Sequence, residues 1–145
     1  MVRASRLHEA TSVFVMTLLV AATSPEGRFA GVESPLSPDA LSDLLNELQR
    51  RGQGYVEVHD ARAAWPMLAV GLSGNRAVIH LFKSADSVSL LRGAGPIPGA
   101  AIDVLIMDEI ATFDGSFAVS LETARVVVQQ FARRSLPDGL VWHRL

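Results

Sequence analysis

Two short apolar runs separated by a three-residue turn constrain the fold of this chain more than any other feature. Residues 67–72 read MLAVGL, residues 76–82 read RAVIHLF, and Ser73-Gly74-Asn75 lies between them. Glycine and asparagine tolerate the positive φ angles of a tight turn, so the pattern predicts an antiparallel β-hairpin. Hairpin-linked strands are therefore the expected basis of the sheet.

Further strands are predicted on both sides of this hairpin. Residues 55–59 alternate, with Val56 and Val58 on one face and Tyr55, Glu57 and His59 on the other. We expect the second face to meet solvent or a partner. Shorter strands are predicted at residues 28–33, 88–92 and 102–107, a loop at 93–99 and an acidic turn at 111–116.

Two helices are indicated by capping residues and by apolar spacing. Ser37 can cap the first, Pro38 suits its first position and Gly52 marks its end, while Ser120 can cap the second. Their apolar faces are predicted to comprise Leu41, Leu44, Leu45 and Leu48, and Leu121, Ala124, Val127, Val128 and Phe131. The fold expected for residues 1–145 is a single α+β domain with a mixed, mainly antiparallel sheet packed against two helices.

Composition excludes several classes of function. The 145 residues include no cysteine, which removes disulfides, thiolate nucleophiles and thiolate zinc sites. The four histidines are His8, His59, His80 and His143, and their spacing matches no metal motif, so neither a metal nor another cofactor is expected. A net charge of -2 provides no general attraction to phosphate backbones, so direct nucleic-acid binding is not expected.

The apolar segment Val13–Ala22 has two interpretations. Arg3 and Arg6 precede it, as in a signal peptide, whereas Glu9 and the β-branched residues of the run favour a buried strand. The run is shorter than the ~20 apolar residues of a membrane-spanning helix, so no membrane association is expected.

Motifs of enzymes are missing from the sequence. Residues 71–74 retain only a fragment of the GxSxG nucleophile elbow. His59 and Asp60 could serve as a base and its orienting acid, but neighbours on a strand point to opposite faces. We therefore predict a protein without enzymatic activity.

The last third of the chain carries the clearest indication of function. After the strand IDVLIMDEI and the turn ATFDGS come a helix, a proline-containing break and the closing VWHRL. The pattern resembles the carboxy-terminal signature of the immunity protein 1 family, the antitoxins encoded beside bacterial polymorphic and contact-dependent toxins. The chain departs from it at residues 134–137, RSLP, where a Gly-Arg-Pro-like segment is usual. The matching residues are Ala118, Val119, Ala124, Arg125, Phe131, Pro137, Val141 and Trp142.

The resemblance implies a cytoplasmic protein that neutralises a cognate toxin in a tight one-to-one complex. Some relatives in the family are paired with nucleic-acid deaminase toxins, so it permits such a partner. The alternatives are a secretion-system chaperone, a small structural domain and, less favoured, a small hydrolase. The chaperone and the structural domain are compatible with the composition, whereas the hydrolase is disfavoured because no nucleophile, metal set or cofactor motif is present.

Charge segregation indicates where a toxin would bind. Residues 95–124 contain no lysine or arginine. Their carboxylates fit a solvated strand end, a paired-carboxylate site at Asp108-Glu109, or an acidic surface that meets the basic groove of a toxin acting on nucleic acid. Trp65 and Trp142 are read as core residues more readily than as contacts. The predicted toxin-binding residues are Asp103, Asp108, Glu109, Asp114 and Glu57.

Overall fold

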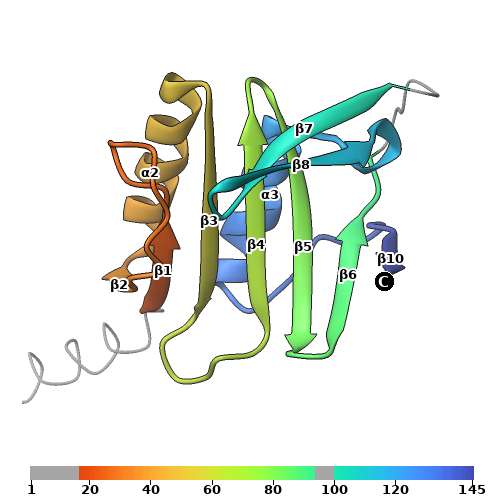
Figure 1. The fold of residues 1–145 in the computed structure, drawn as a ribbon. Helices are drawn as coiled ribbons and strands as arrows, with labels where there is room; N and C mark the ends of the chain where they lie inside the picture. The colour runs from red at the N-terminus through yellow and green to blue at the C-terminus, as the bar shows by residue number, and fades with distance from the viewer. Residues whose placement is uncertain (1–16, 94–99) are drawn as a thin grey trace, which may run out of the picture.

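A central antiparallel sheet lies between two helices on one face and a separate β-hairpin on the other (Figure 1). The structure, a computed structural model, describes residues 17–93 and 100–145. The helices are α2 (Pro38–Arg51) and α3 (Leu121–Ala132), with the 3-10 turn η1 (Gly115–Phe117). The strands are β1 (Leu18–Ala22), β2 (Ser34–Leu36), β3 (Gln53–Asp60), β4 (Met67–Ser73), β5 (Arg76–Ser84), β6 (Ser87–Leu91), β7 (Ala101–Ile106), β8 (Glu109–Asp114), β9 (Val119–Ser120) and β10 (Trp142–Arg144).

The strand order of the sheet is β10-β6-β5-β4-β3-β1-β2, and β9 pairs with β5. All strand pairs in the described residues are antiparallel. The predicted hairpin is confirmed as β4 and β5, with Val70 opposite Ile79 and Gly74 at a φ of 60° in the turn. The α+β class is therefore confirmed, with a sheet that is antiparallel throughout this part of the chain.

Both helices begin at the predicted caps. The Ser37 side chain accepts a hydrogen bond from the Ala40 amide, and the Ser120 side chain accepts one from the Thr123 amide. Gly52 ends α2 in the left-handed conformation. The helices cover one face of the sheet, where the fully buried side chains include Leu41, Leu45, Leu48, Val56, Val58, Leu68, Val70, Ile79, Val127 and Val128.

The strands predicted at residues 13–22 and 28–33 need correction. Only residues 18–22 of the predicted run form β1, while residues 13–16 lie outside the described residues and test neither interpretation of that run. The strand predicted at 28–33 is wrong, because this segment connects β1 to β2, which begins at Ser34. Most of the predicted loop at 93–99 also lies outside the described residues.

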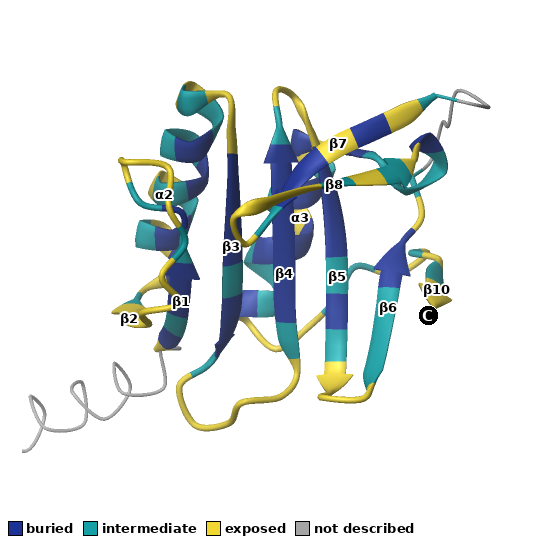
Figure 2. Cartoon of the chain, viewed as in Figure 1, coloured by how far each residue is buried: buried dark blue, intermediate teal, exposed yellow. Residues whose placement is uncertain are grey.

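The hairpin of β7 and β8 covers the second face of the sheet, and sequence patterns did not predict it. Residues 109–114 are strand β8, so the prediction of a turn over 111–116 is wrong for most of its length. The expectation that the second face of β3 meets solvent or a partner is also wrong at Tyr55 and His59, which the chain itself buries to 3% and 9% exposure. Figure 2 shows β3 largely buried beside the hairpin, whose tip is exposed.

Gly71 on β4 permits the close approach of this hairpin to the sheet. A Cβ at this position would lie 2.7 Å from the backbone oxygen of Leu105 on β7. A glycine inside a strand commonly marks such a backbone contact. The position of the hairpin therefore depends on residue 71 being glycine, which has no Cβ.

Residues of the carboxy-terminal pattern hold the helices together. Ala124 is buried, and the guanidinium of Arg125 donates hydrogen bonds to Asn46 and to Gln49, at 2.8 Å for the second, on α2. Trp142 begins β10 and packs against the core, as predicted, whereas Trp65 lies in the β3–β4 loop and is 40% exposed. The matching residues placed in this way support the fold.

Candidate functional site

The tip of the β7–β8 hairpin is an exposed surface that combines apolar and acidic side chains. Met107 and Asp108 form the turn, and Met107 has a φ of 59°. Met107 and Ile110 are 51% and 58% exposed. Asp108 and Glu109 are exposed beside them. We call Met107, Asp108, Glu109 and Ile110 the hairpin tip.

The predicted toxin-binding carboxylates on the hairpin are spread along its length. Asp103 on β7 lies opposite Thr112 and accepts a hydrogen bond from its hydroxyl at 2.6 Å. Asp114, at the far end of β8, caps η1 by accepting a bond from the Ser116 amide at 2.8 Å. This bond is the main cause of the lowered pKa of Asp114. Asp103 and Asp114 share the outer face of the hairpin, because side chains of a strand alternate.

Asp108 has a structural contact in addition to its exposure. Its carboxylate accepts a hydrogen bond from the Phe29 amide at 2.7 Å, which ties the hairpin turn to the β1–β2 segment. Neighbouring Glu109 opens β8, opposite Ile106. Asp108 therefore holds the hairpin turn in position. A catalytic pair formed by Asp108 and Glu109 would not need this contact.

Glu57 belongs to β3 and is not part of the hairpin. It accepts a hydrogen bond from the Tyr55 hydroxyl at 2.6 Å, and burial together with this bond raises the pKa of Tyr55. The Tyr55 ring meets the Phe29 ring edge-on, with 5.0 Å between centroids. Phe29 thus links Tyr55 to Asp108, while Glu57 is half-buried on β3.

An ion pair between buried His59 and exposed Glu33 was not predicted. The Nε2 atom of His59 is 2.5 Å from a Glu33 carboxylate oxygen, and Nδ1 is 2.8 Å from the backbone oxygens of both Asp60 and Ala63. Burial alone lowers the pKa of His59, but the bonds to Glu33 and to the two carbonyls outweigh it and raise the pKa. Both ring nitrogens are therefore engaged in holding the β1–β2 and β3–β4 segments.

The side chain of Asp60 turns away from His59, as the strand alternation predicts. Its carboxylate accepts hydrogen bonds from Arg62, at 3.0 and 3.2 Å, and from Arg134, at 3.0 Å. Burial alone would raise the pKa of Asp60, but the bonds from Arg62 outweigh it and lower the pKa. His59 and Asp60 consequently form no base and acid pair.

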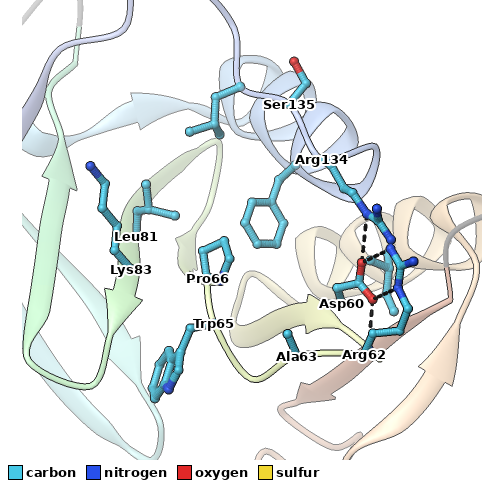
Figure 3. Close-up of a pocket in the computed structure, with 12 residues that line it drawn as sticks. Asp60, Arg62, Ala63, Trp65, Pro66, Leu81, Lys83, Arg134 and Ser135 are labelled. Carbon is cyan, nitrogen blue, oxygen red and sulfur yellow. Dashed lines mark hydrogen bonds and ion pairs between the residues drawn. The ribbon is translucent and has the colours of Figure 1, made fainter.

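An apolar pocket of about 720 Å³ lies where α3 ends, on the helix-covered face of the sheet. Figure 3 shows Leu81 and Lys83 on one side and Asp60, bonded to Arg62 and Arg134, on the other. No sequence pattern indicated this pocket, because its walls come from four separate segments. They comprise Leu18, Asp60, Arg62, Ala63, Trp65, Pro66, Leu81, Lys83, Phe131, Arg134, Ser135 and Leu136.

Neither comparison with known proteins gives the chain a relative: no protein-family model matches it, and no curated protein does. Within the described ranges 17–93 and 100–145, no three histidine or carboxylate side chains come together as a metal site. None of the helices in these ranges is long and apolar enough to cross a membrane.

Proposed function

We propose that this chain is a cytoplasmic immunity protein, similar to the immunity protein 1 family, that neutralises a cognate toxin by covering its active site. The observation that carries the proposal is the hairpin tip, which presents exposed Met107 and Ile110 beside carboxylates. The carboxy-terminal resemblance indicates that the partner is a toxin, and the hairpin tip is the surface proposed to bind it.

The apolar residues of the tip suit the centre of a protein interface. Large exposed apolar side chains that lie together mark interaction sites, and methionine adapts its shape to a partner. Met107 and Ile110 lie three positions apart around one turn. Burial of both against a toxin would contribute most of the binding free energy, as a few central residues do in other interfaces.

The carboxylates around the tip suit a basic partner. Residues 100–124 contribute no cation to this surface, and Asp103, Asp108 and Glu109 are exposed. A toxin that acts on nucleic acid needs a positively charged substrate groove. An acidic hairpin would be steered into such a groove and would compete there with phosphate. A nucleic-acid deaminase is the toxin class that we favour.

The hairpin is also held in place before binding. The bond between Asp108 and the Phe29 amide fixes the turn, and the close contact of Leu105 with Gly71 fixes β7. A preformed surface loses less conformational entropy when it binds. A hydrolase is not favoured, because both ring nitrogens of His59, which precedes Asp60, are engaged.

The experiment is co-expression with a toxin encoded by a neighbouring gene that is lethal on its own. We expect the wild-type chain to restore growth and to form a one-to-one complex. Replacing Met107 and Ile110 together by serine should weaken binding by about ten-fold or more, mainly through faster dissociation. If the wild-type chain neither binds nor protects against any adjacent toxin, the proposed function is wrong.

The contribution of the carboxylates is tested without disturbing their structural bonds. The variant Asp108→Asn, Glu109→Gln, Asp114→Asn removes three charges but retains oxygen acceptors for the Phe29 and Ser116 amides. We expect slower association with weaker salt dependence and little change in dissociation. The matched control, with the same charge change at exposed sites elsewhere, is Glu26→Gln, Asp86→Asn, Asp138→Asn. Equal association rates for both variants at low salt would eliminate the acidic surface but not the immunity function.

A further inference from the structure

The pocket at the end of α3 has an apolar interior that no residue of the described chain fills. Leu18 and Leu81, 1% and 5% exposed, belong to the sheet, while Phe131 and Leu136 are half-buried and line the pocket from α3 and its following segment. Its volume, about 720 Å³, lies in the range of small-molecule sites. Water in such a space meets few hydrogen-bonding partners, so an apolar ligand body would displace it favourably.

The rim of the pocket carries more positive than negative charge. Arg62 and Arg134 both pair with Asp60, so a single carboxylate faces two guanidinium groups. Their side chains are 63% and 52% exposed, which leaves donors free for another acceptor. Among the described residues, Lys83 on the opposite side has no carboxylate within ion-pair distance. The rim therefore favours an anionic group.

We propose that this pocket binds an amphipathic carboxylate, a ligand with an apolar chain or ring system and one anionic head. The apolar part lies against Leu81 and Phe131, and the head meets the guanidinium groups of Arg62 and Arg134, which suit a planar carboxylate. Lys83 adds attraction from the other side. The hairpin tip lies on the opposite face of the sheet, so this binding activity is separate from toxin neutralisation.

Dodecanoate, below its micelle concentration, is the probe for a binding experiment. Trp65 lines the pocket, and Trp142→Phe makes it the only tryptophan of the chain, so its fluorescence reports occupancy. Calorimetry on the unaltered chain supplies the stoichiometry. We expect saturable one-to-one binding of dodecanoate, at least ten-fold weaker binding of dodecanol, and weaker binding still of dodecylammonium.

Substitutions in the pocket test the location of the site. Ala63→Phe should occlude it and abolish binding, whereas the matched control Ala61→Phe, at an exposed neighbour outside the pocket, should bind normally. Arg134→Gly and Lys83→Gln should each weaken dodecanoate but not dodecanol, and Arg133→Gln should change neither. Folding of each variant is checked by its unfolding midpoint. Absent saturable binding, equal affinity for dodecanoate and dodecanol, or unchanged affinity in folded Ala63→Phe would each overturn the proposal.

Discussion

Arg134 adopts a backbone conformation that helix ends usually reserve for glycine. Its φ is 62°, and the amides of Arg134 and Ser135 donate to the carbonyls of Phe131 and Gln130, each at 2.9 Å, which closes the end of α3. For a residue with a Cβ this conformation costs about 1 to 2 kcal/mol. Its compensating contact is the exposed ion pair with Asp60.

Arg134→Gly should therefore leave the stability unchanged or raise it by about 1 kcal/mol. Relief of the left-handed conformation is worth more than an exposed ion pair, which typically contributes about 0 to 1 kcal/mol. Urea denaturation of both proteins measures the difference. A loss above 1 kcal/mol would mean that the side chain of Arg134 stabilises the fold by more than its backbone strain destabilises it.

The pair of Glu33 and His59 should make stability depend on pH. The raised pKa of His59 means that its contribution is fully present below about pH 6.5, the ordinary value, and is lost as pH rises through the folded value. The advantage of the wild type over Glu33→Gln in unfolding free energy should therefore be larger at pH 6 than at pH 9. Denaturation at both values measures it.

His80 serves as an internal control for this measurement. Burial lowers its pKa, so its own contribution has the opposite sign and is lost as pH falls. Because it is common to both proteins, it cancels in the difference. An NMR titration should show the midpoint of His59 falling in Glu33→Gln while that of His80 stays constant. A constant difference in stability across the range would refute the coupling.

Residues that act on their near neighbours in the chain could be predicted from the sequence. Ser37 and Ser120 were identified as caps because a cap bonds an amide three positions away. Glu33, just before β2, and His59 on β3 are 26 positions apart and meet only when β1 has paired with both of these strands. Phe131 was placed correctly on the apolar face of its helix, but its spacing could not show that it borders a pocket.

The β7–β8 hairpin is the element on which the proposed function depends. Its attachment to β4 requires glycine at position 71, since an added Cβ would lie 2.7 Å from the Leu105 oxygen and about 3.0 Å from the side chain of Val104. The oxygen belongs to the backbone, so the contact is relieved only by shifting the whole strand.

Gly71→Ala should therefore displace the hairpin and destabilise the chain by about 1 to 3 kcal/mol, the usual cost of overpacking. Amide chemical shifts of residues 101–114 should change more than those of α2, and toxin affinity should fall with them. The matched control is Gly74→Ala in the β4–β5 turn, which has open space around its Cβ site but carries a positive φ. Unchanged shifts in the hairpin of Gly71→Ala would show that its attachment does not depend on this glycine.

There is a physical reason why the β7–β8 hairpin could not be predicted from the sequence. Its turn, Met107-Asp108, lacks the glycine or asparagine pair that marked the β4–β5 turn. Strand β8 has an exposed face, so its threonine and aspartate resemble loop residues. The acidic residues were found by composition, but their distribution over tip, outer face and far end follows from the register with β7.

At the scale of the whole molecule, the α+β class followed from the number of strands and the two capped helices. The assignment of each layer did not, because α2, α3 and the hairpin are all amphipathic and nothing local states which face of the sheet each one covers. The result is two separate surfaces. Since the hairpin tip and the pocket lie on opposite faces, substitutions at one should add independently to substitutions at the other.

The edge strands of the central sheet affect whether copies of the protein pair with one another at high concentration. In the strand order, β2 and β10 are the outermost members, and each is three residues long. Pro35 in β2 has no amide hydrogen to donate, and Arg144 in β10 places an exposed charge where another chain would pair. An edge strand normally exposes unpaired backbone N–H and C=O groups, to which a strand of another copy can bind. Within the described residues, the short and interrupted margins of the central sheet therefore give another copy little to pair with.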